Sequence, residues 1–292
     1  MIDYFLSPFL DNEFMRLALL AGLVTAVICA VAGTFIVLRG LAFIGDALAH
    51  GVLPGIAAAT LLGVSTIVGA AVGAAVLVGG VGLITKRTRL SSDTAIGLLF
   101  VGMLALGVIM TSRSASFAGD LTRILFGELL GANESQLMWM TMATLVVGAV
   151  TYVCRRPFML LCISRDLARA NGFNASLFEA LMMSVIGVAI LASFQSVGTL
   201  LVFGLLIAPP STAALVTRRL HTMIVVASVS GVIATYIGLL VSFHHDLAAG
   251  ASVVVSATAI FVLVFVVSTV RHRRVSDGHP AVSHTGGHHH AH

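Results

Sequence analysis

The stretch "FIGDALAHGVLPG", residues 43–55, places an aspartate and a histidine four residues apart among apolar and small residues. An acidic side chain in hydrocarbon costs about 2.5–3.5 kcal/mol on insertion scales, so it requires a reason if this stretch lies in a membrane. On a helix, Asp46 and His50 would share one face, about 5–6 Å apart. The spacing therefore predicts either a binding site or an Asp–His pair whose two side chains only satisfy each other.

The composition places this stretch in a membrane protein. Hydrophobic residues make up 58% of the 292 residues and charged residues only 10%, whereas soluble domains carry about 25% charged residues. Because so little polar surface is available, we predict an all-α fold, a polytopic bundle of membrane-spanning helices. The formal charge of +4 does not indicate a nucleic acid partner, since the basic residues lie at the ends of apolar runs.

Apolar runs long enough to span a membrane follow one another along the chain. A spanning helix needs about 20 residues, and most of the runs reach that length. Eight or nine spans are predicted, because the first two runs nearly touch and one run contains Pro209-Pro210. We expect a transmembrane domain over residues 1–271 and a disordered His-rich tail over 272–292. The runs lie at about 15–38, 41–62, 66–85, 94–112, 135–154, 177–197, 199–217, 222–243 and 249–270.

Glycines are abundant within these runs. Most of the 29 glycines lie inside them, as in "GAAVGAAVLVGGVG" (69–82). Gly69 and Gly73 have the small-xxx-small spacing that lets two helices approach closely, so we expect them at a helix contact.

The basic residues predict the orientation in the membrane. With nine spans and the N-terminus outside, one side receives thirteen Lys and Arg residues and the other receives three. Such an excess marks the cytoplasmic side, so we expect a multi-pass protein of the cell membrane with a cytoplasmic C-terminus. An even number of spans would move only the N-terminus. The larger set is Arg39, Lys86, Arg87, Arg89, Arg155, Arg156, Arg165, Arg169, Arg218, Arg219, Arg271, Arg273 and Arg274, and the smaller is Arg16, Arg113 and Arg123.

The opening stretch carries side chains that suit a metal ion. A carboxylate and a neutral imidazole can bind divalent zinc, manganese or iron. One chain offers two such ligands, Asp46 and His50, and a symmetric dimer would offer four. The glycines and the proline of the stretch predict a broken or kinked helix, where membrane proteins often place binding sites. The only lysine is Lys86 and no Gly-Lys-Ser/Thr sequence occurs, so any ATP hydrolysis would take place on another chain.

Five segments, in order, resemble the permease subunits of ABC importers for zinc, manganese and iron, which have a type II importer fold. The segments are "GDALAHGVLPGIA" (45–57), "LFGELLGANESQL" (125–137), "SRDLARANGFN" (164–174), "VGTLLVFGLLIAPPSTA" (197–213) and "DLAAGASVVV" (246–255). The resemblance implies that Asp46 and His50 coordinate the metal in the translocation path. It also implies a homodimer in the lipid bilayer, two copies of a separate ABC ATPase subunit, and an extracellular or periplasmic metal-binding protein that delivers the ion.

Residues 163–174 lie on the predicted cytoplasmic side. Ala168 and Gly172 have a small-x-x-x-small spacing that resembles the ATPase-coupling loop of these importers, so we expect a short helix that a partner approaches closely. Arg165 and Asp166 would set the register of that contact. The alternative is an ordinary basic loop.

Some polar residues elsewhere are secondary candidates. Glu128 lies inside the apolar run "ILFGELLG" and is the best of these as a second cation contact. With Asp120, Arg123 and Glu134 it would line an outer mouth or contact a substrate-delivering protein, or Asp120 and Arg123 would form a surface pair worth under about 1 kcal/mol. The His-His-Asp cluster at 244–246 would attract cations at the entrance, although a solvated loop is the favoured explanation.

The C-terminal sequence "DGHPAVSHTGGHHHAH" contains six of the eleven histidines. His-rich tracts bind zinc, copper or nickel, so the tail predicts metal binding at the cytoplasmic exit unless it is a dispensable segment. Its chemistry puts zinc ahead of manganese as the cargo. The six are His279, His284, His288, His289, His290 and His292.

Together these features predict a transport subunit, not an enzyme, that moves a divalent metal ion to the cytoplasm and holds no permanent cofactor. The same fold could instead import an iron chelate or a cobamide. Such a large substrate needs a wide path and no close metal ligands, so the Asp46 and His50 pair argues against it. An intramembrane metalloenzyme would need a complete ligand set, and no His-Glu-x-x-His sequence is present. An ion-driven metal transporter is a third alternative, which copurification with an ATPase would exclude.

Overall fold

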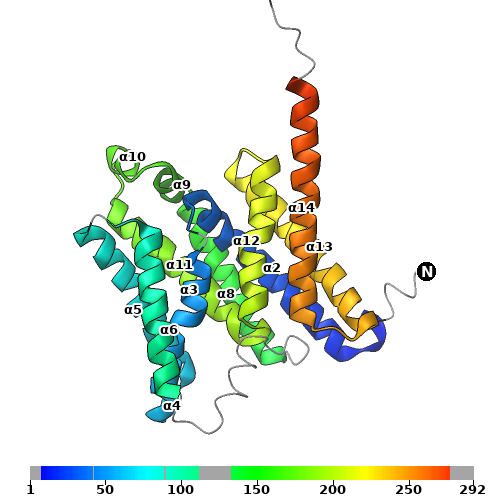
Figure 1. Cartoon of the computed structure of the whole chain (residues 1–292), viewed down its shortest axis with the longest axis horizontal. Coiled ribbons are helices and arrows are strands. Elements are labelled where there is room, and N and C mark those ends of the chain that lie inside the picture. The colour runs from blue at the N-terminus through cyan, green and yellow to red at the C-terminus, as the bar shows by residue number, and fades with distance from the viewer. Residues whose placement is uncertain (1–7, 42, 89, 112–132, 277–292) are drawn as a thin grey trace, which may run out of the picture.

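The computed structural model describes residues 8–41, 43–88, 90–111 and 133–276, which form a bundle of α-helices (Figure 1). Within these ranges there are helices and turns but no β-strand. The composition explains this result, because in hydrocarbon each backbone N–H and C=O group must be satisfied inside the protein, which a helix does within its own segment. The predicted all-α fold is confirmed.

Eight helices in the described part of the chain are long and apolar enough to span a membrane. The predicted span at 41–62 is instead divided into two helices of nine residues each, α3 (Phe43–Gly51) and α4 (Leu53–Leu61). Two further short helices, α9 (Arg155–Ile163) and α10 (Arg165–Ala170), lie between α8 and α11. The eight long helices are α2 (Glu13–Arg39), α5 (Thr66–Arg87), α6 (Ser92–Thr111), α8 (Glu134–Val153), α11 (Ala175–Val197), α12 (Thr199–Val216), α13 (Leu220–His245) and α14 (Ala249–Ser276).

Helix α2 lies at the centre of the bundle and packs against α8, α11, α12 and α13 (Figure 1). Of its apolar stretch 72% is buried, against 11% for α14 at the edge. Gly33 allows a close approach, since a Cβ there would collide with the Leu206 carbonyl and lie 2.8 Å from Pro210. Because Pro210 has no N–H, it cannot donate to that carbonyl four residues earlier in α12. The tight contact at Gly33 makes α2 the fixed element around which the other helices are arranged.

The break in the second apolar run lies at Val52, between α3 and α4. Glycines of two neighbouring helices press against it. A Cβ added to Gly73 of α5 would lie 3.0 Å from the Val52 Cα, and one added to Gly107 of α6 would lie 3.1 Å from the Leu53 Cβ. Pro54 stands in the first turn of α4, where a proline starts a helix well but cannot continue the hydrogen bonds of a preceding one. The break is therefore held in place by close packing, as the glycines and the proline predict.

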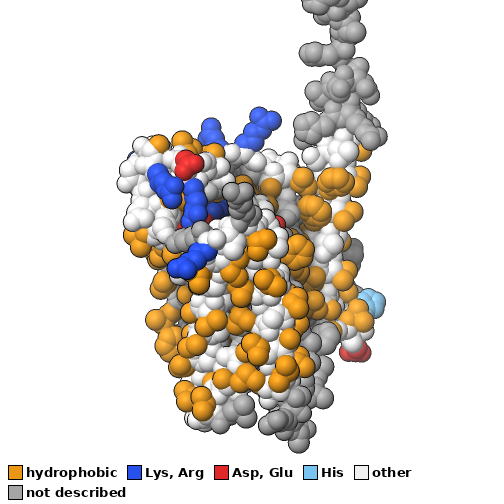
Figure 2. Space-filling model, turned by 60° about the vertical axis from the view of Figure 1, so that its left-hand side comes forward, with side chains coloured by type: hydrophobic (Ala, Val, Ile, Leu, Met, Phe, Trp, Pro, Cys, Tyr) orange, Lys and Arg blue, Asp and Glu red, His pale blue; other side chains and the backbone are white. Residues whose placement is uncertain are grey.

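Charged and apolar side chains occupy different parts of the surface. Figure 2 shows Lys and Arg side chains gathered at one end of the molecule, the end that carries α9 and α10 in Figure 1, with hydrophobic side chains over the flank below. Large apolar side chains such as Leu145, Val153 and Val255 are two-thirds or more exposed. An apolar belt below a basic end is the surface expected of a protein embedded in a bilayer.

Candidate functional site

Helix α3 carries both predicted metal ligands. Asp46 and His50 lie in its continuous helical segment, so the backbone confirms that the two positions share one face. The Asp46 side chain lies outside the described side chains. His50 is half-buried in the last turn of α3, and its ring centroid lies 6.0 Å from that of Phe100 on α6. The imidazole therefore stands at a contact between α3 and α6, just before the break at Val52.

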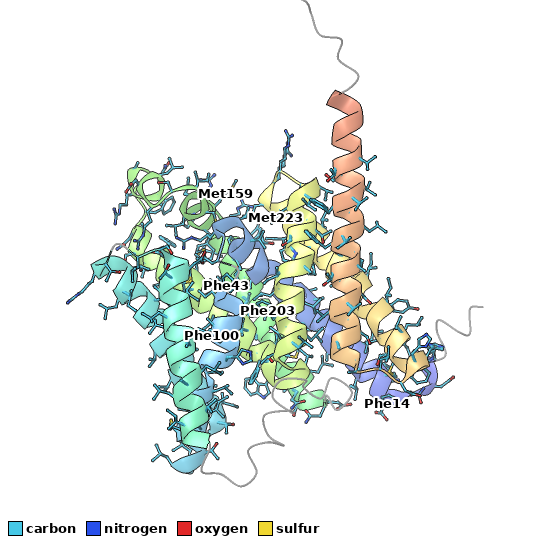
Figure 3. All side chains as sticks on the ribbon, viewed as in Figure 1. Phe14, Phe43, Phe100, Met159, Phe203 and Met223 are labelled. Carbon is cyan, nitrogen blue, oxygen red and sulfur yellow. The ribbon has the colours of Figure 1, made fainter. Side chains whose placement is uncertain are left out.

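The two sides of α3 differ in burial. Ile44, Ala47 and Leu48 are at most 2% exposed and face the core. Phe43, which lies about two turns before His50 on the same side, is 65% exposed. Figure 3 labels Phe43 with Phe100 and Phe203, which come from α6 and α12. The side of α3 that carries Phe43 and His50 is therefore less buried in a single chain than the side that carries Ile44 and Leu48.

Among the described residues, no three His, Cys, Asp or Glu side chains gather closely enough to hold a metal ion. This search does not include the Asp46 side chain, nor Glu128, Asp120, Arg123 and the tail histidines, which lie outside the described residues. The described part of one chain thus assigns at most His50 to such a site.

The predicted coupling segment contains the short helix α10. Ser164 accepts a hydrogen bond from the Asp166 N–H at 3.2 Å and caps its start, and Gly172 follows its end with φ 81°. Ala168 is fully buried against Leu161 of α9. Both small residues were expected to face a partner. Instead, Ala168 packs α10 against the bundle, and only Gly172 of the small-x-x-x-small pair is exposed.

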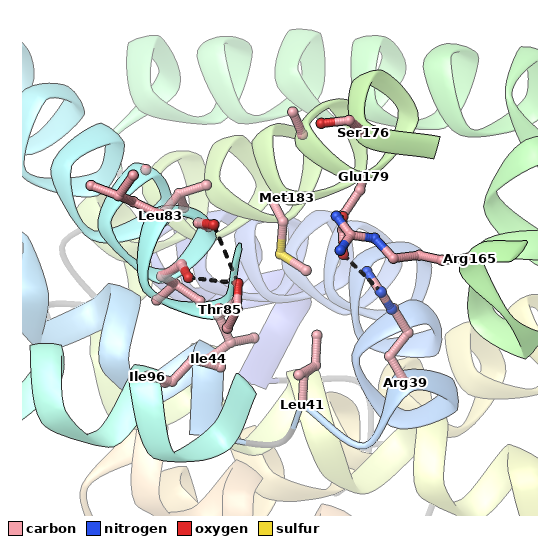
Figure 4. Close-up of a pocket in the computed structure, with 15 residues that line it drawn as sticks. Arg39, Leu41, Ile44, Leu83, Thr85, Ile96, Arg165, Ser176, Glu179 and Met183 are labelled. Atoms are coloured by element: carbon pink, nitrogen blue, oxygen red, sulfur yellow. Dashed lines mark hydrogen bonds and ion pairs between the residues drawn. The ribbon is translucent and has the colours of Figure 1, made fainter. Parts of the chain in front are cut away.

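Two ion pairs that share one glutamate join α10 to the centre of the bundle (Figure 4). No pattern in the sequence indicated them. An Nη2 donor of Arg39, the last residue of α2, lies 3.0 Å from Glu179 Oε1. Arg165, the first residue of α10, donates to the other carboxylate oxygen of Glu179, on α11. The side chains are 15%, 23% and 37% exposed for Arg39, Glu179 and Arg165. We call these residues the Arg–Glu–Arg network.

A cavity of about 340 Å³ lies beside the network (Figure 4). Besides the three charged residues, its walls come from Leu41, two residues after the end of α2, and from α3, α5, α6 and α11; they include Ile44, Gly82, Ile96 and Met183. These walls are mostly apolar. The cavity therefore separates the start of α3 from α5 and α11, at the end of the bundle where the basic residues gather.

The Asp166–Arg169 pair on α10 differs from the network in its exposure. Its N–O distance is 3.3 Å, and the two side chains are 88% and 61% exposed. Solvated pairs of this kind contribute at most about 1 kcal/mol. Asp166 therefore remains available on the surface, as expected of a residue that contacts a partner.

Cys162 of α9 lies close enough to the network to respond to its charge. Burial raises the pKa of the Cys162 thiol to about 11, while the positive charge of Arg39 acts in the opposite direction. The thiol is therefore protonated at neutral pH. Cys29, Cys154 and Cys162 are all free thiols.

The His-His-Asp cluster forms the end of α13. His244 Nδ1 lies 2.9 Å from the Leu240 carbonyl oxygen, and Asp246 ends the helix with φ 50°. Glu134 lies in the first turn of α8 and is exposed. These residues serve helix termini, and the structure does not bring them to α3.

Residues 11–268 match the family model described as the ABC 3 transport family. The chain belongs to this family. It is a multi-pass membrane subunit of the ABC transporter class, and this membership favours the permease over the metalloenzyme and over the ion-driven transporter.

Relatives in this family carry names that refer to metal transport. The chain is 34% identical to the manganese transport system membrane protein MntC of Halalkalibacterium halodurans, over 90% of either chain. It is also 34% identical to a probable iron transport system membrane protein of Haemophilus influenzae, over 94% of this chain and 100% of the relative. The solved structure of PsaBC from Streptococcus pneumoniae in complex with Fab matches with a TM-score of 0.80 and 30% identity, over 91% of this chain and 95% of that one.

Proposed function

We propose that this chain is the permease of an ATP-driven importer for a divalent transition-metal ion, and that Asp46 and His50 hold the ion partway across the membrane. The observation that carries the proposal is the position of both residues on one helical face of α3, with the His50 side less buried than the opposite side and the break at Val52 directly after it. The names of the manganese and iron relatives support the same class of cargo.

Manganese is our first choice of cargo, ahead of iron and zinc. A carboxylate and imidazole set accepts manganese, and manganese appears in the name of a relative that covers 90% of this chain. The histidine-rich tail favours zinc instead. That preference stays a prediction, which a comparison of zinc uptake with manganese uptake would decide.

A second copy of the chain would complete the site. If two α3 helices face each other across a two-fold axis, two carboxylates and two imidazoles surround one ion. Phe100 beside His50, and Phe43 once a second chain covers it, would limit the access of water, which would strengthen the attraction between a carboxylate and a cation. The set contains no thiolate, so it binds the ion less tightly than a soft site does and can release it to the cytoplasm.

The partners follow from the same arrangement. The basic end with α9 and α10 faces the cytoplasm, where two copies of an ATPase dock at α10 through Arg165, Asp166 and Gly172. The C-terminus lies on the same side, and residues 272–292 bind metal as an accessory tail. A metal-binding protein delivers the ion at the opposite end, where Glu128 would make a second contact.

Uptake of radioactive manganese into proteoliposomes tests the proposal. Asp46→Asn and His50→Ala are each expected to lower uptake by about tenfold or more, because each removes a metal ligand. The ATPase should still copurify with both variants, since α10 is unchanged.

Asp93→Asn and His221→Ala are the matched controls. Both residues are exposed at helix starts, on α6 and α13, and the substitutions make the same chemical changes away from α3. Uptake by the controls should equal that of the unaltered chain. Near-normal uptake by His50→Ala would instead mean that Asp46 and His50 only satisfy each other.

A further inference from the structure

The Arg–Glu–Arg network connects two places that the proposed function uses separately. Arg165 is the first residue of α10, where the ATPase is proposed to dock, and Arg39 is the last residue of α2, with residues 40–42 between it and the start of α3 at Phe43. Glu179 bonds to both, one carboxylate oxygen for each arginine. We propose that Glu179 is a positioning residue that transmits movement of α10 to the start of α3; this inference rests on the proposed function.

The link from Arg39 to α3 is short and well defined. Gly40 ends α2 with φ 66°, and its N–H donates to the Val37 carbonyl at 3.2 Å. The Leu41 carbonyl then accepts the Ile44 N–H at 3.0 Å, so the two helices are joined by a compact turn. Only positions 40–42 separate Arg39 from α3, so a displacement of the Arg39 guanidinium has a short path to the first turn of α3, and Asp46 lies seven residues after Arg39.

The charges explain why one carboxylate can hold the three elements together. Glu179 balances only one of two guanidinium charges, so its removal would leave two like charges facing each other. The side chains of Arg39 and Glu179 are largely buried, and breaking a buried pair costs more than breaking an exposed one. Arg39 Nη1 and Arg165 Nε are buried without a hydrogen bond in the described structure. The network therefore depends on Glu179 and retains donors for a second arrangement.

The cavity gives the start of α3 room to move. Leu41 and Ile44 lie on one wall, and Gly82 of α5 lies on another. A Cβ added to Gly82 would meet nothing within 4 Å. The other end of α3 has no such room, because Gly73 and Gly107 press on the break after it. A push from α10 would consequently tilt α3 about its fixed end and shift the face that carries His50.

The test compares uptake with ATP hydrolysis in the same proteoliposomes, which contain the full chain and its copurified ATPase. Arg39→Gln breaks the link to α3 but leaves the Arg165–Glu179 pair at the docking helix. We expect ATP hydrolysis to stay close to that of the unaltered complex, while manganese taken up per ATP falls about tenfold, within the usual range of coupling between sites. Glu179→Gln should give the same loss. Arg155→Gln, which removes an exposed arginine of α9 outside the network, should leave the ratio unchanged.

A purely structural role predicts a different result, namely that assembly, hydrolysis and uptake of Arg39→Gln fall in proportion. That outcome, or an unchanged ratio, overturns the inference. Gly82→Leu provides a second variant, because it fills the cavity and leaves all three charges in place. It should also lower uptake per ATP, and a normal ratio in Gly82→Leu overturns the inference even if the charge variants do not assemble. Failure of the proposed function is distinguishable, since then the unaltered complex takes up no manganese.

Discussion

The two ends of α3 are held in different ways. At the end that follows His50, the packing is close. A Cβ added to Gly73 of α5 would lie 3.0 Å from the Val52 Cα, and one added to Gly107 of α6 would lie 3.1 Å from the Leu53 Cβ. Before the start of α3, the end of α2 is held by an ion pair between Arg39 and Glu179 of α11, and α3 borders a cavity of about 340 Å³. Close backbone packing therefore restrains one end of α3, whereas the other end, beside a cavity and an ion pair, is where the proposed movement would take place.

The largest effect is expected where backbones touch. Gly69 of α5 and Gly55 of α4 lie so close that a Cβ on either would collide with the carbonyl oxygen of the other. Gly69→Ala should therefore lower the free energy of unfolding by about 1–3 kcal/mol, because a backbone must shift. Thermal unfolding in detergent measures this change.

Gly79→Ala is the control on the same helix. An added Cβ at Gly79 meets nothing within 4 Å, so alanine should be neutral or stabilise the helix by about 0.5–1 kcal/mol. Equal effects at Gly69 and Gly79 would remove the distinction between the packed and the open parts of α5.

A smaller effect is expected at the contact of α6 with the break. At Gly107 an added Cβ lies 3.1 Å from the Leu53 Cβ and 3.3–3.4 Å from atoms of Pro54. These atoms lie on or next to the backbone and would have to shift by a few tenths of an ångström, so Gly107→Ala should cost about 1 kcal/mol in stability. Because the break directly follows His50, uptake should fall more than stability. Unaltered uptake at reduced stability would show that the break does not position His50.

The smallest effect concerns Cys162, which reports on the charged end. A chain that retains only this cysteine should react with maleimide slowly at neutral pH, because burial raises the thiol pKa to about 11. At pH values below this pKa, each increase of one pH unit should raise the rate about tenfold, because the thiolate fraction rises by that factor. Since the Arg39 charge lowers this pKa, Arg39→Gln should raise it and slow the reaction further. An unchanged rate in Arg39→Gln would mean that Arg39 does not lie near α9.

Much of the fold was predictable because the signals are local in sequence. The long apolar runs correspond to α2, α5 and the other long helices, and the proline at position 54 marks the break in the second run. Gly69 and Gly73 were expected at a helix contact, and α4 lies against both. The i, i+4 spacing of Asp46 and His50 likewise fixed their common face once α3 proved helical.

The remaining features depend on contacts between distant residues. Glu179 is an acid inside an apolar run, the same signal that drew attention to Asp46, but its partner Arg39 lies 140 residues earlier. No local pattern indicates that pairing. Ala168 was expected to face a partner because of its spacing from Gly172, yet the fold of α9 and α11 over α10 buries it. Burial of a small residue depends on which helices pack against it, and spacing alone does not give that.

The most direct test of the metal site is pulsed electron paramagnetic resonance of manganese bound to the purified complex. If His50 is a ligand, the spectrum contains nitrogen couplings from imidazole, and His50→Ala removes them together with most of the bound ion. Asp46→Asn should lower occupancy because the ligand loses its charge. Nitrogen couplings and occupancy that persist unchanged in His50→Ala would contradict the account, because α3 would then carry a self-satisfied Asp–His pair and the metal would bind elsewhere.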